Sequence, residues 1–168
     1  MRTLSLVLAA SFLAAPVAGQ APDFSGHWKL NPEQSDAPPA RGGGGGPGGQ
    51  RGRGMGMMPT ELRVRQSKDQ LTIDEQIGDQ DRRLVYNLDG KESRTPGMRN
   101  SEVVSHARLD AGSLLIDGSM TFEGPNGTMK IDSKEVRTLS ADGKTMTVVI
   151  TTTTPRGEMT RKLVYDKQ

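Results

Sequence analysis

Residues 23–31, Asp23-Phe24-Ser25-Gly26-His27-Trp28-Lys29-Leu30-Asn31, decide the fold of this chain. They contain its only tryptophan, and they follow a segment that has the features of an export signal. We interpret them as the opening strand of a small β-barrel. On such a strand His27 and Trp28 point to opposite faces. The stretch therefore predicts architecture, and it gives little information about activity.

The first nineteen residues are typical of a secretion signal. Arg2 supplies the positive end, residues 4–15 form an apolar run too short to span a bilayer, and Val17-Ala18-Gly19 fits a cleavage site. We expect residues 1–19 to be a signal peptide, and residues 20–168 to form one periplasmic or secreted domain without a transmembrane segment. A short N-terminal anchor is the alternative. Without cysteine, the domain must be held together by packing alone.

A low-complexity segment, residues 36–59, contains ten glycines and four prolines. Such a composition buries too little apolar surface to offset the backbone entropy, which predicts a disordered Gly/Arg-rich loop after the first strand. The segment holds Arg41, Arg51 and Arg53, so the net charge of +2 reflects the loop and the rest is close to neutral. This balance excludes a basic nucleic-acid-binding face. We expect a flexible spacer, and the alternative is contact with an envelope polyanion such as an anionic polysaccharide or lipid A phosphate.

From Thr60 onward the sequence indicates a series of β-strands. Apolar residues recur at every second position, which is the period of half-buried strands. Asp89-Gly90, Asn126-Gly127 and Asp142-Gly143 suit tight hairpins, in which positive φ angles are needed. Asn31 could cap a single helical turn over residues 31–35. Beside the opening strand and an extra edge at 92–95, the expected strands are residues 61–65, 71–77, 83–88, 103–109, 113–122, 129–139, 145–154 and 159–165.

Many short strands with little helix predict an all-β fold, an antiparallel up-and-down meander. A meander of this length protects its edges best by closing on itself, so we expect a lipocalin-like barrel of about 8–10 strands. The apolar residues are mostly Val, Ile, Leu and Met, with few aromatics. Such a core is modest, and it can leave a cavity inside the barrel.

Gly26-His27-Trp28, at the start of the first strand, resembles the Gly-x-Trp signature of the lipocalins and the wider calycin superfamily. In those barrels the tryptophan closes one end, and an arginine or lysine near the last strand lies across its ring. The resemblance implies that Gly26, Trp28 and Arg161 are structural residues that close the barrel here, with Lys162 as the alternative cation. Such a cation contributes roughly 0.5–2 kcal/mol.

More specifically, the chain resembles a group of small secreted bacterial lipocalin-like proteins without an assigned activity. The shared elements are residues 24–31, 86–92 and 139–145. The chain also departs from better known calycins. It lacks the Thr-Asp-Tyr element of typical lipocalins, and the glycine-rich loop stands where fatty-acid-binding proteins have a helical lid. Arg161 and Tyr165 do not have the spacing of their Arg-x-Tyr carboxylate clamp, so the ligand does not follow from the resemblance.

No combination of residues in the sequence predicts catalysis. His27 and His106 are expected to be surface or barrel-wall histidines, since no cluster with zinc-ligand spacing accompanies them. The Gly-x-Ser-x-Gly elbow of serine hydrolases is missing. Asp74 and Glu75 are adjacent on a strand, so they face opposite ways, and we expect solvated or edge charges rather than an acid–base pair. We therefore predict no catalytic residues, no metal site and no cofactor.

The favoured function is non-catalytic binding of a small apolar or amphipathic ligand inside the barrel of an exported protein. Its ligand-binding residues are not predicted. An envelope structural or interaction module that uses the Gly/Arg-rich loop is the second hypothesis. An enzyme whose residues are spread over distant strands is the third and least favoured.

Overall fold

The computed structural model describes residues 21–37, 58–97, 101–124 and 127–168. Within these ranges every regular element is a strand, and no helix is long and apolar enough to cross a membrane. The predicted all-β fold is confirmed. The strands are β1 (Gly26–Leu30), β2 (Glu61–Gln66), β3 (Gln70–Ile77), β4 (Gln80–Asn87), β5 (Asp89–Pro96), β6 (Glu102–Asp110), β7 (Ser113–Gly124), β8 (Gly127–Leu139), β9 (Thr145–Thr154) and β10 (Gly157–Lys167).

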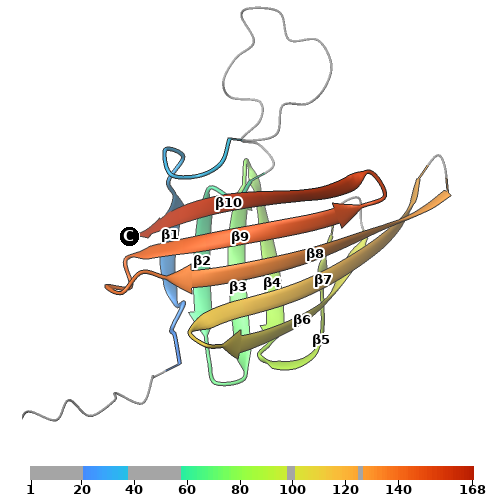
Figure 1. Ribbon diagram of the computed structural model, residues 1–168. Coiled ribbons are helices and arrows are strands. Elements are labelled where there is room, and N and C mark those ends of the chain that lie inside the picture. Colours follow the sequence, from blue (N-terminus) through green and yellow to red (C-terminus); the bar gives the residue numbers. More distant parts are fainter. Residues whose placement is uncertain (1–20, 38–57, 98–100, 125–126) are drawn as a thin grey trace, which may run out of the picture.

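All ten strands belong to one antiparallel sheet in the order β4-β3-β2-β1-β10-β9-β8-β7-β6-β5. The first strand pairs with the last, with Trp28 opposite Lys167 and Leu30 opposite Tyr165. Figure 1 shows the result, in which β7–β10 cross in front of the steeply inclined β1–β4. The predicted meander therefore curls into a barrel in which its first strand, β1, pairs with its last strand, β10.

β4 and β5 are the edge strands of the sheet and are not paired with each other as a ladder. They nevertheless lie in contact, so the barrel is nearly closed. Side chains bridge the two strands. The backbone N–H of Asn87 donates to Ser93 Oγ at 2.8 Å, and Asn87 Nδ2 donates to the Glu92 carbonyl at 3.0 Å. Leu88 connects the two strands, Asp89-Gly90 begin β5 and do not form a paired hairpin turn, and the extra edge expected at 92–95 is part of β5.

Local sequence chemistry explains the turns that are described. Ala111 and Gly112 both have positive φ, 45° and 83°, between the paired residues Asp110 and Ser113, as a two-residue hairpin loop requires. After β1, Asn31 Oδ1 accepts the backbone N–H groups of Glu33 and Gln34 at 3.1 and 3.2 Å. The capping role expected for Asn31 is therefore observed in a short turn.

Both ends of the segment predicted to be disordered are packed against the barrel. Asp36 exchanges two hydrogen bonds with the backbone of Lys162, at 2.8 and 2.6 Å. Met58 is 3% exposed, and the Pro59 carbonyl accepts the Tyr165 hydroxyl at 3.1 Å. The boundaries of the prediction are corrected by these contacts. Residues 38–57 lie outside the described part of the chain, as do the signal peptide and the predicted polyanion contact.

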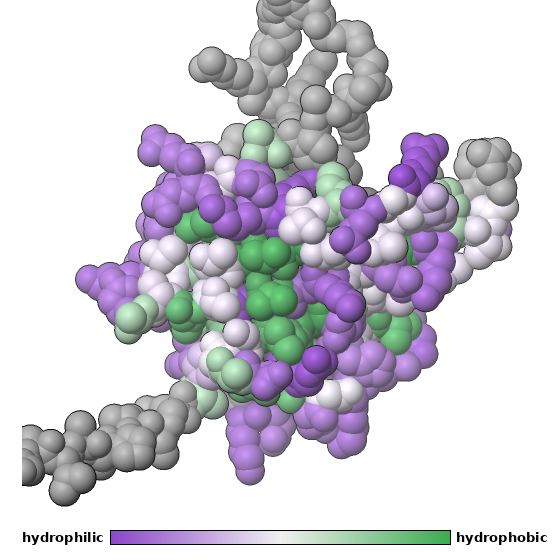
Figure 2. All heavy atoms as spheres, in the orientation of Figure 1, coloured by the Kyte–Doolittle hydropathy of each residue, from purple (hydrophilic) through white to green (hydrophobic). Residues whose placement is uncertain are grey.

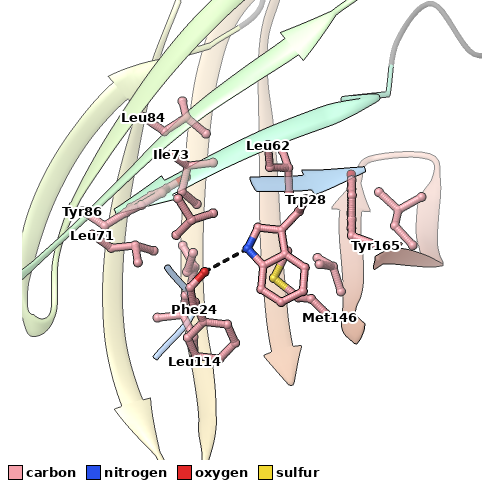
Figure 3. Close-up of a cluster of buried hydrophobic side chains, with 14 of the residues drawn as sticks. Phe24, Trp28, Leu62, Leu71, Ile73, Leu84, Tyr86, Leu114, Met146 and Tyr165 are labelled. Atoms are coloured by element: carbon pink, nitrogen blue, oxygen red, sulfur yellow. Dashed lines mark hydrogen bonds between the residues drawn. The ribbon is translucent and has the colours of Figure 1, made fainter. Parts of the chain in front are cut away.

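The core lies on the inner face of the sheet, where large apolar side chains from facing strands meet. Phe24, Trp28, Leu71, Ile73, Leu114 and Met146 are completely buried there (Figure 3). The outer face is largely polar, with an apolar strip over β7–β9 in the view of Figure 2. Val149, Val136 and Leu115, which are neighbours in the register, are half-buried outward-facing residues of these strands.

Candidate functional site

The interior of the barrel holds a cavity of about 240 Å³ that opens to solvent. Its wall comes from every strand except β1, together with Met58 and Pro59. Trp28 does not line it, because the packed cluster around Trp28 and Phe24 fills that part of the interior. The wall is mixed, with apolar residues such as Leu84, Ile116 and Val148 beside charged and hydroxyl side chains.

Trp28 is anchored from both sides. Its Nε1 donates to the Phe24 carbonyl at 2.9 Å in the buried cluster, as the dashed line in Figure 3 shows. The Nζ of Lys167 lies 5.2 Å from the centroid of its ring. Gly26 lies beside them with a φ of +149°, which favours glycine, and a Cβ there would have to displace Lys167 Cε, which lies 2.6 Å away at the flexible end of its side chain.

The cation over Trp28 is therefore Lys167, which corrects the expectation of Arg161 or Lys162. The register gives the reason, since Trp28 faces Lys167 across β1 and β10. Arg161 lies further along β10, opposite Ile150, and it lines the cavity instead. Periodicity indicated which residues of β10 face inward, but it did not determine the register between the first and the last strand.

An arginine is buried in the cavity wall at Arg137 on β8, with a side chain only 4% exposed. Its Nε donates to Glu135 Oε1, two residues away on the same inner face. Its Nη1 is buried and has no hydrogen-bond partner in the described part of the chain. Burial lowers the pKa of Arg137, but the charge and hydrogen bond of Glu135 more than offset this, so the pKa is raised and the guanidinium is charged.

A second ion pair, Glu75–Arg82, joins β3 and β4 in the same cavity wall. Arg82 Nε and Nη2 donate to Glu75 Oε2 at 3.0 and 2.5 Å, and the Glu75 side chain is only 6% exposed. Its neighbour Asp74 faces outward and pairs with Arg65 and Arg83. The expectation that the two carboxylates face opposite ways is observed, but Glu75 is an internal group and not a solvated or edge charge.

Two tyrosines complete the polar part of the cavity wall. Burial, and after it the charge of Glu135, raises the pKa of Tyr86 far above its ordinary value. Burial also raises the pKa of Tyr165, whose hydroxyl donates to Pro59. Both hydroxyls are therefore neutral at physiological pH, and they act as hydrogen-bonding groups rather than as bases.

Gly118 on β7 lies in the cavity wall beside Ser133 of β8, its partner in the register. A Cβ at this position would meet Ser133 Oγ at 2.8 Å and Val103 Cγ1 at 3.3 Å. The hydroxyls of Ser105 and Ser133 lie beside it. Glycine therefore allows these side chains to pack closely against the backbone of β7.

Both histidines face away from the cavity, as expected of wall residues. His27 Nε2 lies 3.0 Å from Glu61 Oε2, and His106 Nδ1 lies 3.0 Å from the Gly90 carbonyl. Neither lines the cavity. Within the described residues, no group of three or more His, Asp or Glu side chains could hold a metal ion.

Sequence reasoning missed the internal charges. For Glu75 the signal was present, because it continues the alternation of Leu71 and Ile73 and must share their inward face. For Arg137 no local signal existed, since apolar Val136 and Leu139 have opposite parity on β8. Only the pairing with β7 and β9 determines that Arg137, Glu135 and Leu139 point inward.

The fold is shared with solved structures of low sequence identity. Apo Caenorhabditis elegans lipid binding protein 8 matches with a TM-score of 0.58 and 11% identity, over 86% of this chain and 95% of that chain. The REP1-NXSQ fatty acid transporter matches with a TM-score of 0.58 and 13% identity, over 86% of this chain and 96% of that chain. Zebrafish ileal bile acid-binding protein, complexed with cholic acid, matches with a TM-score of 0.55 and 13% identity, over 86% of this chain and 98% of that chain. These likenesses confirm the antiparallel β-barrel fold.

No family model matches the sequence, and no curated protein matches it.

Proposed function

We propose that this protein is an exported, non-catalytic binding protein that holds a small apolar or amphipathic ligand in its barrel. The observation that carries the proposal is the buried Arg137 in the cavity wall, whose Nη1 has no hydrogen-bond partner among the described residues. A buried donor without an acceptor costs about 1–3 kcal/mol or more when it is charged. A ligand that supplies an acceptor beside Nη1 recovers this free energy.

The shape and lining of the cavity support a small amphipathic ligand. Drug-sized ligands occupy pockets of roughly 300–1,000 Å³, and this cavity, at about 240 Å³, is smaller. Its apolar residues can cover a short hydrocarbon part, while Arg137 faces the polar part. The structural neighbours named above bind lipids, fatty acids or bile acids according to their names, which supports ligand binding in a barrel of this shape.

Export is the second element of the proposal. It rests on Arg2, the apolar run of residues 4–15 and the small residues Ala18 and Gly19. The periplasm or the extracellular medium is the proposed location. N-terminal sequencing of the protein recovered from each fraction tests it, and a chain retained in the cytoplasm with its first nineteen residues would contradict it.

Mass spectrometry of the native protein tests ligand binding directly. The purified protein is expected to carry a small molecule that organic extraction releases. Gly118→Val, whose side chain would push Ser133 and Val103 out of their places in the cavity wall, should abolish this cargo while the circular dichroism of the barrel is retained. Thr121→Val on the exposed outer face of β7 is the matched control and should keep the cargo. An empty wild-type protein that also takes up no added amphiphile would refute the proposed function.

A further inference from the structure

The positive charge of Arg137 is already balanced in this structure. Glu135 accepts a hydrogen bond from its Nε, and the charge of Glu75 from the facing wall also acts on the guanidinium. Glu75 itself is compensated by Arg82. What the buried Nη1 lacks is therefore a hydrogen-bond acceptor and not a counter-ion.

A charged acceptor and a neutral acceptor beside Nη1 differ in their free energy of binding. A carboxylate beside Nη1 would share the guanidinium with Glu135, and the two negative charges would repel each other at close range. An uncharged carbonyl would accept the same hydrogen bond, and it would pay only the small desolvation cost of a neutral polar group. The arrangement thus favours a neutral acceptor.

Arg161 is the remaining cation of the cavity wall and needs to be weighed against this reasoning. Across the sheet, Arg161 on β10 is in register with Ile150 on β9 and Glu135 on β8. Arg137 is in register with Val148 and Leu163, which are two residues further from the β9–β10 turn. Its side chain is only half-buried. Water therefore screens its charge more than that of Arg137.

We propose that the barrel selects ligands whose polar group is an uncharged acceptor, such as the carbonyl of an amide, ketone or ester. Glu135 is the residue that discriminates against carboxylates, because it is already paired with Arg137 on the lumen side of β8. This proposal rests on the proposed ligand-binding function and adds the chemical class of the ligand. It assigns Glu135 a role in specificity rather than in stability alone.

Octanamide and octanoate provide a matched pair of probes, since they have the same shape and differ in charge. Isothermal titration calorimetry of the purified protein at neutral pH is expected to show octanamide binding roughly tenfold tighter than octanoate, or better. Glu135→Gln keeps the length and an acceptor oxygen but removes the competing charge. In this variant octanoate should gain about tenfold in affinity and octanamide should change little.

A control variant separates the lumen charge from the overall charge. Glu158→Gln removes one carboxylate from an exposed position on β10 and should leave the ratio of the two affinities unchanged. Wild-type protein that binds octanoate more tightly than octanamide would overturn the selectivity while the binding function stands, and this holds even if Glu135→Gln fails to fold. Binding of neither probe, by a protein that also carries no native cargo, would overturn both.

Discussion

Replacing Trp28 by alanine is the sharpest test of the barrel architecture. The side chain is 0% exposed, and an aromatic of this kind buries about 150–250 Å², which corresponds to roughly 4–6 kcal/mol at about 25 cal/mol per Å². Part of this is recovered by relaxation, and measured losses for such substitutions are about 3–5 kcal/mol. We expect the free energy of unfolding to fall by that amount.

Trp28→Phe divides this loss into its parts. The variant keeps most of the apolar volume but leaves the Phe24 carbonyl without its donor, so a loss of about 1–3 kcal/mol is expected. Urea unfolding followed by far-ultraviolet circular dichroism measures both variants, because the only tryptophan is then unavailable as a fluorescent probe. The slope m, by which the free energy of unfolding falls with urea concentration, should not change. A loss below about 1 kcal/mol for Trp28→Ala is typical of exposed sites and would refute the plugging role.

Two further substitutions test the contacts around the closed end and the cavity. Gly26→Ala should destabilise the barrel by about 1–3 kcal/mol in urea unfolding, because of its positive φ and the clash with Lys167, whereas Gly157→Ala, with φ +125° and no atom near its Cβ, should lose less. Equal losses would argue against the clash. Arg82→Ala should cost about 1–3 kcal/mol, because it leaves the internal Glu75 without its partner, and an unchanged stability would mean that water reaches Glu75.

Alternation along the chain was sufficient to predict the strands, because each face of a half-buried strand is determined by its own residues. β9 shows this, with Met146 and Val148 inward and Thr147 and Val149 outward. The same alternation could have placed Glu75 inside. The barrel could be predicted for a similar reason, since a long meander must protect both of its edges.

Long-range register was not accessible to the same reasoning. Whether Lys167 or Arg161 reaches Trp28 depends on the pairing of the first and last strands, which lie at opposite ends of the sequence. The face of β8 that carries Arg137 depends on its two neighbours, because both faces of β8 contain apolar and charged residues. The burial of Trp28 could therefore be predicted, while the cation over its ring and the charged groups of the lumen required the structure.

The internal ion pairs lie in the part of the barrel where we propose that the ligand binds. Replacing a buried ion pair by well-packed apolar residues is often neutral or stabilising, so Glu135–Arg137 and Glu75–Arg82 are not required to hold the sheet together. The cluster around Trp28 already provides a packed core without any charge. Both pairs lie instead in the cavity wall, where the interior is left unfilled. A barrel that only needed stability would fill this space with side chains, so the charges are best explained by what the cavity receives.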